Sequence, residues 1–235
     1  MKRKYLFQLL FLGVLLLLQS CEVQIMDDRR ILVKGNIVDS SNNPIPGISV
    51  RCESSYLNLG EAISDANGQF EFTSLEVETY NSLNITVNVK EDGYYYYDDY
   101  NYGNLENPAY SAKNYFNNAT NRNAATYNLG RIQLNEVARL ALFINNTPGD
   151  NNSLAYKLNY DTSVCQIDLN VSDSEDCKSF DNSYNQLDPS SSSFDIELES
   201  QLGTTVLFKY ILNNEPEQTI AIPLTNLENT YVFEY

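Results

Sequence analysis

The sequence predicts an all-β protein, made of two consecutive antiparallel β-sandwich domains after a secretory leader. Three observations support this prediction. Apolar and polar residues alternate along many short stretches from residue 31 to the C-terminus, turn-forming residues separate these stretches, and no comparable stretch repeats its apolar residues at helical spacing. Apolar residues make up 43% of the 235 residues, so the chain can bury a core.

Residues 1–20 have the features of a lipoprotein signal peptide. A basic start at residues 2–4 precedes an apolar stretch, residues 5–18, that is too short for a membrane-spanning helix. The tetrapeptide Leu-Gln-Ser-Cys that ends at Cys21 resembles the bacterial lipobox, although glutamine is an uncommon second residue in it. The resemblance implies that Cys21 is acylated and anchors the chain to a membrane. An ordinary signal peptide with a nearby cysteine is the alternative.

Residues 21–30 are a short tether, and residues 31–136 form the first predicted sandwich. The apolar positions of its expected strands are Ile48/Val50/Cys52, Ile85/Val87/Val89 and Ile132/Leu134. Successive side chains of a strand point to opposite faces, so this alternation is typical of a strand buried on one face. Turns are expected at residues 43–47, which contain two prolines and a glycine, and at residues 65–68, where Asn-Gly favours a hairpin.

Residues 137–235 form the second predicted sandwich, in which the same alternation continues. Its apolar positions are Leu140/Leu142/Ile144, Tyr156/Leu158/Tyr160, Cys165/Ile167/Leu169/Val171, Phe194/Ile196/Leu198, Val206/Phe208/Tyr210/Leu212, Ile220/Ile222/Leu224 and Tyr231/Phe233/Tyr235. A single sheet would leave one apolar face in water, so two sheets are expected to pack over each core.

Three motifs in the first predicted sandwich resemble the carboxypeptidase regulatory-like domain. They are residues 33–50, which contain VKGNIVD and NPIPGISV, residues 64–70 (SDANGQF) and residues 129–134 (LGRIQL). The resemblance implies a transthyretin-like (prealbumin-like) sandwich, and it transfers no catalytic residue. The sequence departs from the family at Ser64, where threonine is usual, and in a long insertion before residue 129. Together with the lipobox, the chain looks like a lipoprotein of the Bacteroidota type, whereas residues 137–235 resemble no family that we recognise.

Export would place the remaining thiols in an oxidising compartment. Cys165 and Cys177 lie 12 positions apart around a polar run, so we expect them to form a disulfide. Closing a loop of this size contributes about 3 kcal/mol in the chain-entropy model. Cys52 alternates with Ile48 and Val50 and is expected in the core as a small apolar residue.

Residues 94–127 form a predicted Tyr/Asn-rich insertion, which contains nine of the 18 tyrosines and eight asparagines. A long loop in a compact domain is usually functional or disordered, and binding loops use this residue mixture. The tyrosines proposed as a ligand surface are Tyr94, Tyr95, Tyr96, Tyr97, Tyr100 and Tyr102. The alternative is local structure, in which the first four tyrosines continue the strand from Ile85 and the other rings pack on one another.

Composition excludes several function classes. The net charge of −16 argues against nucleic acid as a partner, and the absence of histidine removes Ser–His and Cys–His catalysis. Acidic residues fall mostly on outward strand positions or in loops, so we expect no enzyme and no catalytic residue. The acidic run at residues 98–106 lacks the spacing of an EF-hand calcium loop, and the run at residues 172–176 is more typical of a solvated loop, so we expect no metal site and no cofactor.

These features favour a non-enzymatic, lipid-anchored protein of the cell envelope, placed at the outer membrane on its periplasmic side or at the cell surface. It would serve as a binding or scaffolding module for a glycan or a protein. The alternative is a structural adhesin or fimbria-type subunit that assembles by β-strand addition. The apolar C-terminal strand, residues 231–235, suits either a strand docked on its own chain or one donated to a neighbour.

Overall fold

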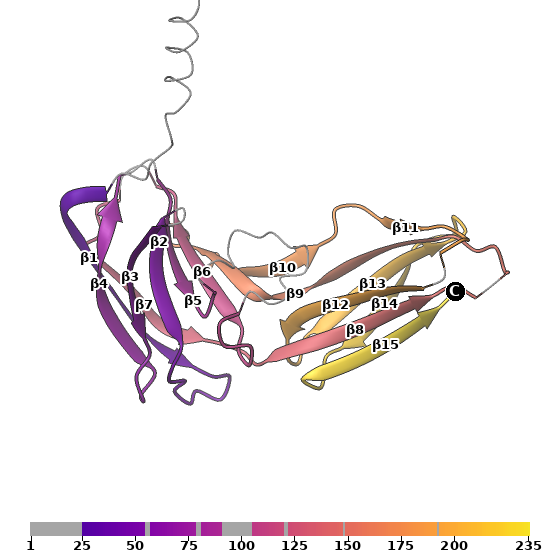
Figure 1. Ribbon diagram of the computed structural model, residues 1–235, viewed down its shortest axis with the longest axis horizontal. Coiled ribbons are helices and arrows are strands. Elements are labelled where there is room, and N and C mark those ends of the chain that lie inside the picture. The colour runs from indigo at the N-terminus through magenta and orange to yellow at the C-terminus, as the bar shows by residue number, and fades with distance from the viewer. Residues whose placement is uncertain are drawn as a thin grey trace, which may run out of the picture.

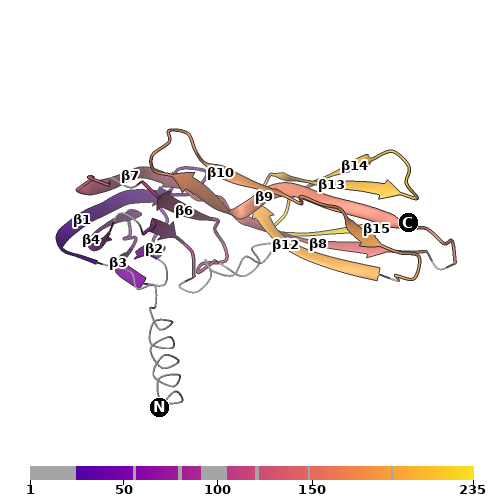
Figure 2. The same cartoon turned by 90° about the horizontal axis from the view of Figure 1, so that it is seen from above.

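The computed structural model describes residues 25–54, 57–78, 81–90, 105–119, 122–147, 149–191 and 193–235. The described chain is all-β, as predicted, and its strands form two sandwiches in one elongated body (Figure 1). The C-terminus lies at the end of the second sandwich that is remote from the first, and the view from above shows the same long shape (Figure 2). Among the described residues, no helix is long and apolar enough to span a membrane.

The first sandwich is built from seven strands. They are β1 (Ile25–Val38), β2 (Ser49–Ser54), β3 (Leu57–Ile63), β4 (Gln69–Val77), β5 (Leu83–Val87), β6 (Ala112–Asn117) and β7 (Thr126–Gln133). One sheet has the order β4-β1-β7, and the facing sheet runs β3-β2-β5-β6. The predicted apolar positions of this half, such as Ile48, Val50 and Cys52, are all buried, and all but Val89 lie in its core. The alternation therefore identified the inward faces correctly.

The predicted hairpin turn forms at residues 65–68. Gly68 adopts a positive φ of 73°, and the backbone N–H groups of Asn67 and Gln69 both donate to Asp65 Oδ1 at 2.8 Å. A Cβ atom at Gly68 would lie 2.2 Å from the carbonyl oxygen of Ile37, so this turn requires glycine for space as well as for conformation.

The second sandwich contains eight strands. They are β8 (Val137–Asn145), β9 (Leu154–Asp168), β10 (Asp176–Phe180), β11 (Asn185–Leu187), β12 (Ser193–Gln201), β13 (Thr205–Leu212), β14 (Gln218–Pro223) and β15 (Glu228–Glu234). Strands β15, β8 and β12 form one layer, and β14, β13 and β9 form the other, with β10 and β11 on the far side of β9. Leu142, Leu158 and Phe208 lie in the core between the layers.

Strand β9 continues beyond the second sandwich and joins the first. Its N-terminal part pairs with β13 over Leu154–Asn159, and its C-terminal part pairs in parallel with β6 over Val164–Asp168. The alternation of buried and less buried side chains along β9 is interrupted at Thr162 and Ser163, which are both buried. The interruption arises because the face of the strand that points inward changes when the strand passes from one sandwich to the other. Val171, which the alternation placed inward, instead lies in the turn after β9 and is 55% exposed.

The sequence predicted a single insertion over residues 94–127, but the structure places strand β6 within this segment. Both faces of β6 are buried, so Asn114 and Lys113 lie beside Tyr115 and no apolar alternation marks the strand. In addition, β1 begins at Ile25, within the segment expected to be a tether, and β9, which falls within the second predicted domain, pairs with β6 of the first.

Candidate functional site

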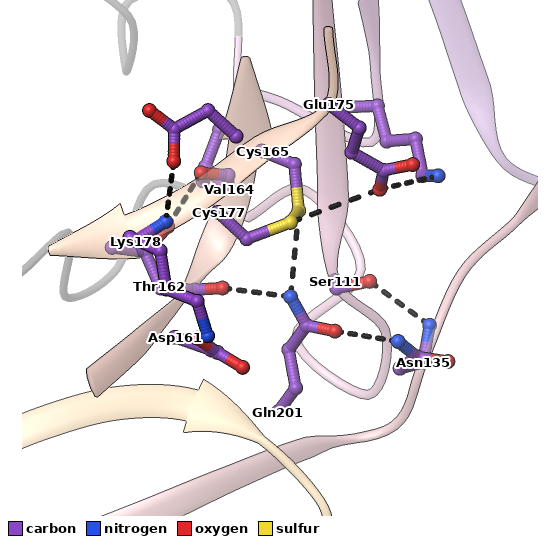
Figure 3. Close-up of a disulfide and its surroundings, with 12 residues drawn as sticks. Ser111, Asn135, Asp161, Thr162, Val164, Cys165, Glu175, Cys177, Lys178 and Gln201 are labelled. Carbon is purple, nitrogen blue, oxygen red and sulfur yellow. Dashed lines mark hydrogen bonds and ion pairs between the residues drawn. A yellow bond between two sulfur atoms is a disulfide. The ribbon is translucent and has the colours of Figure 1, made fainter. Parts of the chain in front are cut away.

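The junction of the two sandwiches contains the disulfide expected from the sequence. Cys165 on β9 and Cys177 on β10 are joined with an S–S distance of 2.08 Å (Figure 3). The bond links two neighbouring strands where their pairing register shifts. Lys113 of the first sandwich approaches Glu175, next to this bond, at 2.8 Å. The disulfide closes the β9–β10 hairpin, and the ion pair ties this hairpin to β6.

A polar network beside the disulfide connects the two halves of the chain. Gln201 at the end of β12 donates to the carbonyl oxygen of Thr162 at 3.0 Å and to Cys165 Sγ at 3.4 Å (Figure 3). Its carbonyl oxygen accepts a hydrogen bond from Asn135, whose backbone N–H donates to Ser111 Oγ at 2.9 Å. Because these groups are largely buried, their mutual bonds fix one arrangement of the junction.

The described residues on the two sides of positions 91–104 are held together at the junction. Val89 and Leu105 form an isolated β-bridge, and both are buried with Val137 of the second sandwich. Asn88, in a left-handed conformation, donates to the carbonyl oxygens of Asn107 at 3.0 Å and Tyr110 at 2.7 Å.

The buried guanidinium of Arg51 adds further contacts between the two sides of positions 91–104. Arg51 pairs with Glu53 at 3.0 Å and with Glu106 at 2.8 Å, and it also donates to the carbonyl oxygen of Val89. Burial acts to raise the pKa of Glu106, but hydrogen bonds from Ser49 and Arg51 outweigh burial and lower that pKa. Glu106, which closes the acidic run at residues 98–106, is therefore bound to Ser49 and Arg51.

A cleft of about 360 Å³ opens in the first sandwich beside β7. Its lining residues are Asn117, Arg122, Asn123, Ala124, Thr126, Tyr127, Asn128, Leu129, Leu169 and Asn170. They come from the end of β6, the connection to β7, β7 itself and the turn after β9. The cleft is therefore built by both halves of the sequence, because the turn after β9 forms one of its walls.

Arg122 fixes the inner side of this cleft. Its guanidinium pairs with Glu76 at 3.3 Å, and it also donates to the carbonyl oxygens of Val77 at 3.0 Å and Asn81 at 2.7 Å. The side chains of Arg122 and Glu76 are both almost fully buried. The arginine thus holds together two connections, one after β4 and one after β6.

The predicted site residues are only partly covered by the described chain. Cys21 and the six tyrosines proposed as a ligand surface, Tyr94 to Tyr97, Tyr100 and Tyr102, lie outside the described residues. Of the other tyrosines in the predicted insertion, Tyr115 and Tyr127 are buried and Tyr110 packs against the core. These three rings therefore pack in the core of the first sandwich or against it. The cleft beside β7 was not predicted, although six of its lining residues lie in the predicted insertion, because Leu169 and Asn170 come from a distant part of the chain.

No family model matches the sequence, and no curated protein matches it. The chain is similar to solved structures of low identity. They include the TIE protein of Bacillus anthracis (10% identity, 88% of this chain and 34% of that chain, TM-score 0.30), the minor pilin GBS52 of Streptococcus agalactiae (12%, 87% and 94%, 0.30) and the tip fimbrial protein Mfa3 of Porphyromonas gingivalis (11%, 83% and 81%, 0.29). The chain spans about a third of the TIE protein.

Proposed function

We propose that this protein is a non-enzymatic, lipid-anchored structural subunit of a cell-surface assembly, of the adhesin or fimbria type. It would join its neighbours by β-strand addition. The observation that carries the proposal is the place of β15, which is an edge strand of the second sandwich and runs parallel to β8 toward the end of the body remote from the first sandwich (Figure 1).

The body suits a structural role because its two sandwiches are continuous. Strand β9 belongs to both of them, and the Cys165–Cys177 bond lies where it passes from one to the other. Bending at this point would break strand pairing and the buried network of Gln201 and Asn135, so the body is expected to transmit force along its length.

The docking of β15 suits exchange between copies. Among the described strands it pairs only with β8, in parallel, and parallel pairing is slightly the weaker kind. Its inward rings contact the second core: the Phe233 ring centroid lies 5.0 Å from that of Phe208 and 4.7 Å from that of Tyr210. The same strand from a neighbour would make identical contacts, as in domain swapping.

A reversible lock on β15 tests the proposal. Val232 and Phe143 are partners in the β15–β8 register, so the double variant V232C/F143C should form a disulfide that keeps β15 docked. In the secreted form with Cys21→Ser, we expect the oxidised variant to stay monomeric and the reduced variant to form multimers, measured by size-exclusion chromatography with light scattering.

The matched control is the secreted form without the engineered cysteines, treated with the same reductant, because reduction also opens the Cys165–Cys177 bond. An identical oligomeric state for the oxidised and reduced variants would contradict exchange of β15. The anchor has a separate test: Cys21→Ser should move the full-length protein from the membrane fraction to the soluble fraction, and unchanged fractionation would remove the lipid anchor from the proposal.

A second candidate function is a binding module for a glycan or a protein. It is favoured by the contacts between the described residues on the two sides of positions 91–104. Asn88, Arg51 and the Val89–Leu105 bridge hold these two sides together. Replacing the tyrosines at positions 94–102 by serine and glycine should abolish binding on a glycan array, with the parent secreted form as the control. Equal binding by both would remove this role.

We keep as a proposal that residues 31–136 are a carboxypeptidase regulatory-like domain. Support comes from the turn at Asp65–Gly68, which the SDANGQF motif forms between β3 and β4, and from the burial of Ile45 and Ile48 in the NPIPGISV motif.

A further inference from the structure

The two sheets of the first sandwich differ in width. The sheet β4-β1-β7 has three strands, whereas the facing sheet β3-β2-β5-β6 is extended by the C-terminal part of β9. The β4 and β3 ends of the sheets meet closely, since Ser74 Cα lies only 3.0 Å from the place of a Cβ atom on Gly60. The difference in width therefore falls at the β7 end. Among the described residues, no strand pairs with the outer edge of β7.

The backbone of β7 presents unused polar groups at this edge. The ladder with β1 is parallel, and the N–H of Leu32 donates to the carbonyl oxygen of Ala125 at 2.9 Å. In this register, which holds as far as Lys34, β1 bonds Ala125, Tyr127 and Leu129, so the N–H and C=O groups of Thr126 and Asn128 point away from β1. Both residues line the cleft.

The chemistry of the lining favours an uncharged occupant. Four of the lining residues are asparagines, and none is a carboxylate, although the chain has 31 acidic residues. Arg122, the one charged lining residue, is occupied by Glu76 and by backbone carbonyls. An occupant with a charged side chain would lose hydration there without gaining a partner.

The shape of the lining favours a polypeptide over a sugar. Sugar sites generally offer an exposed aromatic face, but the ring of Tyr127 is only 7% exposed, and its hydroxyl accepts a hydrogen bond from Asn117 inside the sandwich at 3.2 Å. An extended chain beside β7 would pair with Thr126 and Asn128, and its alternate side chains would contact Leu129, Leu169 and the amides.

We infer that the cleft beside β7 is an acceptor site for an extended, uncharged segment of a partner polypeptide, which adds as a fourth strand to the sheet β4-β1-β7. The inference rests on the proposed function, because it names the edge at which a strand is added. It does not involve β15, which pairs with β8 in the second sandwich.

A display library of random nine-residue peptides, panned on the secreted form with Cys21→Ser, provides the probe. We expect enrichment of uncharged, strand-forming sequences. Thr126→Pro removes an N–H that the β1 ladder does not use, so it should leave the fold intact and weaken binding of the selected peptide at least tenfold. Thr126→Val keeps that N–H and should bind like the parent. Binding should also slow hydrogen exchange at the amides of residues 126 and 128.

Each other outcome overturns the inference. These outcomes are no enrichment over an albumin surface, selection of charged peptides, and equal binding by Thr126→Pro and Thr126→Val at matched circular dichroism. Binding of a neutral glycan that Thr126→Pro abolishes would assign the cleft to a sugar instead. The V232C/F143C lock separates the two proposals, since peptide binding to the locked monomer is independent of multimer formation by the reduced form.

Discussion

At the scale of single residues, the first sandwich depends on a few buried polar groups. Arg122 and Glu76 are the clearest case, because both side chains are almost fully buried and the arginine also bonds several backbone carbonyls. A buried ion pair adds little net stability against an apolar pair, but removing one partner leaves an uncompensated charge.

We therefore expect Arg122→Met to lower the free energy of unfolding by about 3–5 kcal/mol, measured by urea denaturation. Arg131→Met, on the exposed side of β7, is the matched control and should change it by less than about 0.5 kcal/mol. The double variant Glu76→Leu/Arg122→Met should recover part of the loss. Equal stability of the two arginine variants would contradict a central role for Arg122.

The buried thiol of Cys52 gives a prediction for alkaline pH. Burial raises the pKa of Cys52 to about 12 from an ordinary value of 9.0. The folded state thus favours the neutral thiol, and its stabilisation is complete below pH 9 and is lost as the pH rises toward 12. Burial also raises the pKa of Tyr115 and Tyr127, so their ionisation at rising pH lowers the free energy of unfolding in the same way.

The measurement is the free energy of unfolding as a function of pH for the parent and for Cys52→Val, which keeps an apolar side chain of similar size. The parent should lose more stability above pH 9 than the variant, and its thiol should resist labelling at pH 8 without denaturant. Identical pH profiles, or rapid labelling of the native protein, would contradict this account.

At the scale of elements, turns were predicted more securely than strands. The hairpin at residues 65–68 followed from Asn-Gly, and the structure adds that Gly68 touches the carbonyl oxygen of Ile37. Strand β6 escaped prediction because it is buried on both faces and carries polar residues, so neither alternation nor an apolar run marks it.

A comparison of Gly47 and Gly68, which have similar φ values, separates the energetic cost of the left-handed conformation from the cost of steric crowding. Gly68 and Gly47 have φ values of 73° and 78°, but a Cβ atom on Gly47 would have nothing within 4 Å. Gly47→Ala should lower the free energy of unfolding by about 1–2 kcal/mol, the cost of the left-handed conformation alone. Gly68→Ala should cost at least twice as much in the same urea titration. Equal losses would show that the close approach to Ile37 relaxes freely.

At the scale of the whole molecule, β9 couples the two sandwiches. Because it pairs with β13 in one and with β6 in the other, neither sandwich can lose its sheet without disturbing the other. We expect calorimetry of the secreted, oxidised form to give one unfolding transition.

Inserting two glycines between Ser163 and Val164 should split that transition into two, because the insertion interrupts β9 where it passes between the sandwiches. The same insertion between Asn214 and Glu215, in the exposed turn between β13 and β14, is the control and should keep a single transition. Two transitions in the parent, or one in the β9 variant, would contradict the coupling.

The sequence by itself determined the all-β class, the inward faces of most strands and the main turns, and it made Cys165 and Cys177 a candidate pair that the structure joins. These features depend on residues that are close in the sequence. Alternation shows which side chains are kept from water, and the residues of a turn set its local backbone conformation. Only the tertiary structure decided that β9 belongs to two sandwiches, that β15 docks on β8 at the edge of a sheet and that, among the described residues, no strand pairs with the outer edge of β7 beside the cleft. The reason is physical, since backbone hydrogen bonds between strands are nearly independent of side-chain identity, and the choice of partner is made by the packing of distant segments.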